Sequence, residues 1–126
     1  MRYPLVFYVG NLPDGIGGQT IGPVVRIAEK YRYDEGIFRH ELEHVRQGLA
    51  LLFLPHALLY RFVRRYRLWA EARAYSIQMR YPDRNGECLT LALAAYRLAL
   101  PVYDLGITQE KARIALMTHL ARWFSR

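Results

Sequence analysis

The sequence predicts an α+β fold, in which a small N-terminal β-sheet is followed by a mainly helical C-terminal part. β-Branched and aromatic residues gather in two segments before residue 28, as is typical of strands. After residue 34, apolar residues recur at intervals of three and four, which is the spacing of amphipathic helices. The length of 126 residues and the hydrophobic fraction of 52% predict a single domain, residues 1–126, with its own core.

Two strands are predicted before the helices. Residues 3–9 form the first strand, and the four glycines and one proline of residues 10–18 predict a loop after it. Residues 19–27 form the second strand, which Gly22-Pro23 interrupts. Because proline cannot donate a ladder hydrogen bond, we expect this second strand to lie at an edge of the sheet or to carry a bulge.

Four helices are predicted to follow the sheet. The first begins at Asp34 or Gly36 and ends near Leu52, before Pro55, which breaks the helical pattern. Its expected core stripe consists of Leu42, Val45, Leu49 and Leu52. The remaining helices are predicted over residues 60–81, 87–100 and 109–124, the last with Thr108 as its N-cap.

The net charge of +7 is spread along the chain, with one cluster at Arg61, Arg64, Arg65 and Arg67. A solvated helix face is the simplest interpretation of this cluster, and contact with phosphate or lipid is the alternative. No specific nucleic-acid partner is expected. The single cysteine, Cys88, excludes an internal disulfide and a cysteine-rich zinc site.

The most apolar segment covers residues 49–60 and is bounded by Arg61. Pro55 and His56 interrupt it, and it is shorter than the roughly 20 residues that span a bilayer. A buried helix end followed by a loop is the first interpretation, and peripheral membrane contact through residues 49–67 is the alternative. Since the sequence has neither a signal-peptide core nor a full transmembrane segment, a cytoplasmic location is expected.

Residues 40–44, His-Glu-Leu-Glu-His, match the pattern H-E-x-x-H inside the first predicted helix. Histidines four residues apart lie one turn apart on the same helix face, so the imidazoles of His40 and His44 can converge on one metal ion. Glu41 lies between them in sequence and can reach a water at that ion. This combination is typical of zinc hydrolases, with the glutamate as general base.

A catalytic zinc ion generally has three protein ligands, so a third ligand must come from elsewhere in the chain. The candidates are His56, Glu71, Asp104 and His119. Glu71 is favoured, because small residues surround it in a predicted helix and allow close packing against a neighbour. A carboxylate that faces a core needs a partner, and a divalent cation would supply one. The alternative for Glu71 is an ordinary salt bridge with Arg67 or Arg73.

Peptide hydrolysis also requires a donor for the tetrahedral oxyanion and a surface that positions the substrate. The candidate donors, some of which could instead support the metal ligands, are Tyr75, His56, Arg73 and His119. The predicted edge strand over the motif helix, with Thr20, Gly22 and Val24, is expected to receive an extended peptide by strand addition.

His40 to His44 followed by Glu71 resembles the gluzincin clan of zinc metallopeptidases, whose familiar member is thermolysin. The short chain is similar to minigluzincins, which keep only the active-site subdomain. Extended to Gln47, the motif H-E-x-x-H-x-x-Q resembles that of small bacterial and phage-associated metallopeptidase-like proteins. A Thr-x-Gly edge strand, here residues 20–22, and an E-A-x-A-Y segment, here residues 71–75, are also similar.

This resemblance covers about residues 19–80 and implies that His40, His44 and Glu71 bind zinc and that Glu41 is the general base. One position departs from the pattern. Thermolysin-like enzymes have an aspartate four residues after the third ligand, where it orients a ligand histidine, and this chain has Tyr75 there. The large helical domain that forms the far wall of their cleft also has no counterpart here.

These patterns predict a zinc-dependent peptidase with one Zn²⁺ per chain. It would cleave peptide or protein substrates as an endopeptidase rather than an exopeptidase. The alternative is a catalytically weak or inactive, zinc-stabilised interaction module of a phage or bacterial assembly. A third hypothesis is a basic protein that binds nucleic acid or a membrane surface through Arg61 to Arg67.

Overall fold

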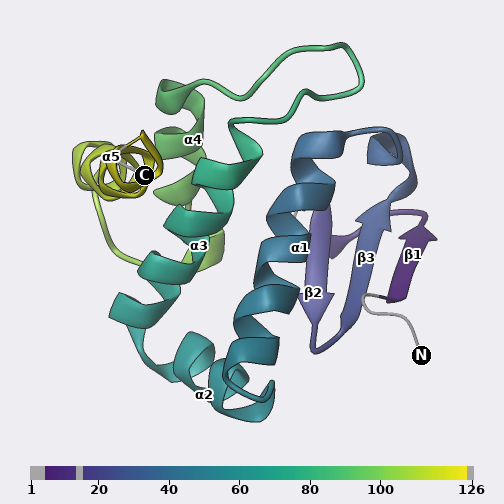
Figure 1. Cartoon of the computed structure of the whole chain (residues 1–126), viewed down its shortest axis with the longest axis horizontal. Coiled ribbons are helices and arrows are strands. Elements are labelled where there is room, and N and C mark those ends of the chain that lie inside the picture. The colour runs from purple at the N-terminus through teal and green to yellow at the C-terminus, as the bar shows by residue number, and fades with distance from the viewer. Residues whose placement is uncertain (1–4, 14–15, 125–126) are drawn as a thin grey trace.

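The chain has the predicted α+β fold in the computed structural model, which describes residues 5–13 and 16–124 (Figure 1). The strands in this part of the chain are β1 (Leu5–Val9), β2 (Gly18–Ile21) and β3 (Val24–Ala28). The α-helices are α1 (Glu35–Ala50), α2 (Leu54–Phe62), α3 (Arg64–Gln78), α4 (Leu91–Leu98) and α5 (Gln109–Phe124). Short 3-10 helices cover Glu29–Tyr31 and Pro101–Tyr103.

The described strands form one sheet in the order β1-β3-β2, with β1 parallel and β2 antiparallel to the central β3. The prediction of a single strand over residues 19–27 is wrong, because the chain reverses at Gly22-Pro23 to form a hairpin. Gly22 has a φ of +58°, and proline keeps a negative φ, which together suit a type II′ turn. β2 is therefore one of the two edge strands of the described sheet, and β1 is the other. Residues 3 and 4 of the predicted first strand lie outside the described residues.

Helix α1 begins where the sequence predicts. The Asp34 side chain accepts a hydrogen bond of 2.8 Å from the Ile37 amide and thereby caps the helix. The predicted core stripe is partly wrong, since Val45 is buried against β3 whereas Leu49 and Leu52 are 47% and 81% exposed. The face of α1 that turns inward is instead largely polar, and its buried residues include the two motif histidines.

The single helix predicted over residues 60–81 is two helices, α2 and α3, separated by Val63 in an extended conformation. The buried Arg67 explains why the break is stable. Its guanidinium donates hydrogen bonds to the carbonyl oxygens of Tyr60 and Arg61, 2.8 and 2.9 Å away, at the C-terminal end of α2. These carbonyls would otherwise lack helical partners.

Helix α3 lies between α1 on one side and the α4–α5 pair on the other (Figure 1). The side chains of Ala70, Ala72 and Ala74 are fully buried, which lets α3 approach its neighbours closely. The helical core joins α3 to both later helices through Ala72, Tyr75, Ala94, Ala95, Leu98, Leu105, Ala112 and Leu116. Helix α5 begins as predicted, and Thr108 Oγ1 accepts from the Lys111 amide at 3.1 Å. Within the described residues, no helix combines the length and apolar character needed to cross a membrane.

Candidate metal centre

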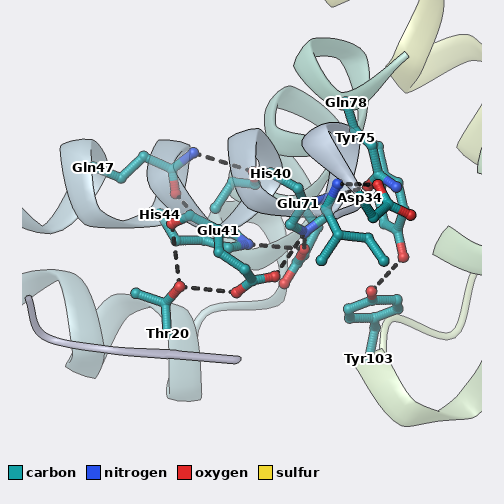
Figure 2. A network of polar contacts seen from close by, with 12 residues as sticks. Thr20, Asp34, His40, Glu41, His44, Gln47, Glu71, Tyr75, Gln78 and Tyr103 are labelled. Carbon is teal, nitrogen blue, oxygen red and sulfur yellow. Dashed lines mark hydrogen bonds and ion pairs between the residues drawn. The ribbon is translucent and has the colours of Figure 1, made fainter. Parts of the chain in front are cut away.

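Two histidines of α1 and one glutamate of α3 meet in the interior of the protein (Figure 2). His40 Nε2 and His44 Nε2 each lie 3.1 Å from Glu71 Oε1. One candidate ligand atom from each residue lies within 4.8 Å of the others, and no more than 7% of any of the three residues is exposed. These residues, the His–His–Glu cluster, could therefore hold a metal ion.

The charges within the His–His–Glu cluster depend on one another. Burial alone would raise the pKa of Glu71, but the imidazoles of His44 and His40 hold that pKa well below its usual value. Burial opposes a charge on His44, yet the neighbouring Glu71 carboxylate raises the pKa of His44 to about 9. At neutral pH a proton on the imidazole thus balances the carboxylate. A metal ion bound at the same atoms would have to displace this proton.

Gln47 fixes the tautomer that His44 needs in order to bind a metal through Nε2. The Gln47 amide nitrogen donates to the carbonyl oxygen of Ala70 at 3.1 Å, and a carbonyl can only accept. Gln47 Oε1 must therefore face His44 Nδ1, 3.1 Å away, and accept a hydrogen bond from its N–H group. In the neutral form of His44 the lone pair then lies on Nε2, which points into the cluster.

Gln78 supports His40 in the same way. His40 Nδ1 donates to Gln78 Oε1 at 2.9 Å, and the ring of Tyr75 packs edge-on against the imidazole, with centroids 4.4 Å apart. The orienting group thus lies seven residues after Glu71, two turns along α3, and not four residues after it. Sequence reasoning missed this residue, although positions 71, 75 and 78 share one helix face and could have suggested it.

Tyr60 holds the other oxygen of the Glu71 carboxylate. Its hydroxyl donates to Glu71 Oε2, while Oε1 faces the two imidazoles. Burial, followed by the nearby Glu71 charge, raises the pKa of Tyr60 well above its usual value, so the phenol remains a donor. Sequence reasoning missed Tyr60 because its position depends on the unpredicted break between α2 and α3.

Glu41 lies beside the His–His–Glu cluster, and a hydrogen bond from a residue of the sheet holds its side chain in place. Thr20 Oγ1, on β2, lies 2.8 Å from Glu41 Oε1 and 3.1 Å from the Glu41 backbone oxygen. The second carboxylate oxygen, Oε2, is 3.8 Å from His40 Nε2. Gly18 makes room for this arrangement, because a Cβ atom at that position would lie 2.8 Å from Glu41 Cγ. The edge strand β2 thus places the Glu41 carboxylate next to the candidate ligand atoms of the cluster.

The cluster opens into a cleft of about 390 Å³ between β2 and the helices. Of the residues predicted for the substrate edge strand, Thr20 and Gly22 line this cleft, whereas Val24 belongs to the central strand β3 and does not line it. A second cavity, of about 290 Å³, shares Gly18, His40 and Glu41 with the first and continues towards Asp34 and Arg97. There is therefore space on both sides of the Glu41 side chain.

Two of the predicted accessory residues lie near the cluster but have other partners. The hydroxyl of Tyr75 is 2.5 Å from the hydroxyl of Tyr103 and does not point at the cluster as a free donor. His56, on α2, lines the cleft, and its Nδ1 lies 2.6 Å from the hydroxyl of Tyr66. Tyr103 also lines the cleft, and no sequence signal had selected it.

The remaining candidates lie elsewhere. His119, on α5, packs against Trp69 with ring centroids 6.3 Å apart and does not line the described cleft. Burial, followed by the charges of Arg73 and Arg122, lowers the pKa of His119 to about 4. Asp104 pairs with Arg64 at 3.2 Å, and Arg73 binds Glu43 at 2.8 Å. Of the four candidates for the third ligand, the structure thus brings Glu71 to the histidines.

Comparison of the chain with known protein families, with curated proteins and with solved structures finds no match. That the site could hold a metal ion therefore rests on its own geometry. The site is a buried cluster of two imidazoles and one carboxylate. A glutamine amide oxygen accepts a hydrogen bond from Nδ1 of each imidazole, and the Glu41 carboxylate lies beside His40.

Replacing Gln78 with leucine is expected to weaken metal binding without removing it. The substitution keeps the side chain's bulk but leaves the Nδ1 proton of His40 without an acceptor, and loss of such a supporting group typically reduces metal affinity about 10- to 100-fold. Titration with Zn²⁺ against a competing chromophoric chelator measures this change. Gln19→Leu, on β2, is the matched control, because Gln19 bonds Arg26 and neither imidazole. Equal affinities for the two variants would contradict the role given to Gln78.

Proposed function

We propose that this protein is a zinc-dependent peptidase that hydrolyses peptide bonds with Glu41 as general base. One observation carries the proposal. The carboxylate of Glu41 is fixed by Thr20 of an edge strand, next to a buried His–His–Glu cluster, in a cleft with space on both sides. The resemblance of the H-E-x-x-H motif and Glu71 to gluzincins agrees with it.

Zinc suits the donor atoms of this cluster. Two neutral imidazole nitrogens and one carboxylate oxygen are a common ligand set of catalytic zinc, which leaves a coordination position for water or substrate. When bound, zinc supplies a Lewis acid that polarises a peptide carbonyl and increases the acidity of water. Gln47 and Gln78 each accept a hydrogen bond from an Nδ1–H group, so Nε2 is the atom left to bind zinc once its own proton is displaced, and Tyr60 holds the carboxylate in place.

Glu41 would move the proton during the reaction. Its carboxylate lies close enough to His40 Nε2, at 3.8 Å, to accept a proton from a water between the cluster and the substrate carbonyl. The same carboxyl group would then protonate the leaving amine. Thr20 restricts the carboxylate to the orientation that faces the cluster. His56 and Tyr103 both line the cleft and could stabilise the oxyanion; Tyr103 would do so when Tyr75 donates the hydrogen bond between their hydroxyls, which leaves the Tyr103 proton free.

The edge strand β2 would position the substrate. Its outer edge is not paired with another described strand, and its residues form one wall of the cleft. An extended peptide could therefore add to the sheet as a fourth strand and pass over Glu41. Because the two cavities lie on both sides of Glu41, residues before and after the cleaved bond have space, which favours an endopeptidase.

One observation favours the alternative, a zinc-stabilised module with weak or no catalysis. Both groups behind the histidines are neutral glutamine amides, and these increase ligand basicity less than a carboxylate does. In that case zinc would mainly join α1 to α3 and stabilise the fold. The presence or absence of turnover in the zinc-loaded protein separates the two functions.

Hydrolysis of an unstructured protein substrate by the zinc-loaded chain is the direct test. We expect cleavage at internal peptide bonds, its loss on treatment with a zinc chelator, and its recovery when Zn²⁺ is added back. Mass spectrometry of the products identifies the cleaved bonds. Stoichiometric zinc with no cleavage of a diverse set of substrates would favour the non-catalytic module, and cleavage that a chelator leaves unchanged would contradict the proposal.

A further inference from the structure

Exposed basic and apolar side chains surround α2, the helix at the lower end of the view in Figure 1. These side chains belong to residues 51–65, and we call the surface that they form the α2 surface. They are Leu51, Leu52, Leu54, Leu58, Arg61, Phe62, Arg64 and Arg65, all of them exposed.

Helix α2 directs one row of apolar side chains away from the protein. None of its nine residues, which all belong to the described part of the chain, is buried. Leu54, Leu58 and Phe62 follow each other at intervals of four along one face and are 67%, 50% and 71% exposed. The opposite face carries His56 and Tyr60, which line the cleft. The outward stripe therefore has no function in the site described above.

The backbone just before α2 has a strained conformation, and this conformation exposes the side chain of Leu52 to solvent. Leu52 and Phe53 have φ values of +60° and +57°, which are costly for residues other than glycine. Phe53 turns back towards Gly48 and lines the cleft, whereas the side chain of Leu52 points into solvent. Leu52 is 81% exposed, so packing within the described chain does not offset the cost of its backbone conformation.

The charged residues of the segment around α2 are all positive. Residues 45–70 contain five arginines and no aspartate or glutamate. Arg67 is buried and bonds backbone carbonyls, while Arg61, Arg64 and Arg65 are exposed at the end of α2 and the start of α3. Exposed leucine and phenylalanine side chains beside several arginines match a bilayer interface, where acyl chains lie next to anionic phosphates.

We infer that the α2 surface docks the protein on membranes that contain anionic phospholipid. The leucines and Phe62 would enter the boundary between headgroups and acyl chains, and Arg61 and Arg65 would bind lipid phosphates, whereas Arg64 already pairs with Asp104. The nine residues of α2 suit a helix that lies in the plane of the interface. Because Phe53 and Ala57 line the cleft from the same segment, docking would hold the cleft beside the lipid surface.

Co-sedimentation of the full chain with vesicles tests this inference. Vesicles that contain about one third phosphatidylglycerol in phosphatidylcholine are expected to bind the wild type, with binding that falls steeply when salt is raised about fivefold. Pure phosphatidylcholine vesicles are expected to bind at least tenfold more weakly. Equal binding to both vesicle types, or no binding to either, would overturn the inference.

Two double variants separate the contributions of charge and apolar contact. Arg61→Gln with Arg65→Gln is expected to weaken binding about 25-fold, because each arginine near an anionic surface contributes about fivefold. Leu58→Ser with Phe62→Ser is expected to weaken it at least tenfold. The matched control, Leu93→Ser with Ile114→Ser, removes comparably exposed apolar side chains from α4 and α5 and is expected to bind like the wild type.

Circular dichroism establishes that each variant is folded. A third readout does not depend on any loss of function. In Leu58→Trp, brominated acyl chains are expected to quench more of the fluorescence than they do in the wild type. Absence of this extra quenching would overturn the inference, as would a lipid-free dimer that dissociates on the Leu58→Ser and Phe62→Ser changes.

Discussion

Replacing Glu41 with glutamine is expected to reduce peptide hydrolysis by about a thousandfold while zinc stays bound. A general base typically accelerates proton transfer by about 10²–10⁴-fold, and an amide cannot accept the proton. Glutamine keeps the size of the side chain and can still contact Thr20, so the fold and the ligand atoms of His40, His44 and Glu71 are unchanged. Steady-state rates measured together with zinc content by elemental analysis test this expectation.

Glu35→Gln is the matched control for this substitution. Glu35 lies on the same helix and bonds Arg39 at 2.9 Å, on the surface and away from the cleft. We expect it to retain wild-type turnover and zinc content. Undiminished turnover in Glu41→Gln would rule out Glu41 as the base, and a loss of zinc in that variant would mean that Glu41 supports the metal instead.

The parts of the fold that the sequence predicted well depend on local chemistry. The side chains of Asp34 and Thr108 each accept a hydrogen bond from an amide three residues later and so cap α1 and α5. These two residue types therefore indicated where both helices begin. The spacing of His40 and His44 fixes their common helix face in the same local way. Glu71 required one further argument, from the alanines around it, and the structure places it between the two imidazoles.

The parts that were predicted wrongly depend on contacts that exist only in the folded chain. Gly22-Pro23 is compatible with either a bulge or a tight turn, and pairing with β3 selects the turn. No glycine or proline marks the break at Val63, which Arg67 stabilises by bonding carbonyls of the preceding helix. Tyr60 reaches the site through that break and was missed for this reason.

The core stripe of α1 failed for a different physical reason. Apolar periodicity identifies the buried face of a helix only when the buried face is apolar. In α1 the inward face carries His40, His44 and Gln47, which satisfy one another or groups on α3, so Leu49 and Leu52 remain outside. Of these two exposed leucines, Leu52 belongs to the α2 surface.

Replacing Glu71 with glutamine is expected to remove zinc from the protein. The buried carboxylate is the negatively charged member of the His–His–Glu cluster, and an amide leaves a doubly charged ion facing two neutral imidazoles at low dielectric. Zinc content after dialysis is expected to fall from about one per chain to near zero, and hydrolysis with it. The outcome differs from that of Glu41→Gln, in which turnover falls but zinc remains.

Thermal unfolding adds a readout that does not require an active enzyme. A ligand that binds the native state at about a thousandfold excess over its Kd stabilises it by about 4 kcal/mol, so added Zn²⁺ is expected to raise the Tm of the wild type and of the Glu35→Gln control. The Tm of Glu71→Gln is expected to be insensitive to Zn²⁺. If Glu71→Gln instead bound zinc with wild-type affinity, the third ligand would be another residue of the cleft, and His56 would be the first to test. Loss of both zinc and the zinc-dependent Tm shift would establish that α1 and α3 are joined through a metal held by His40, His44 and Glu71.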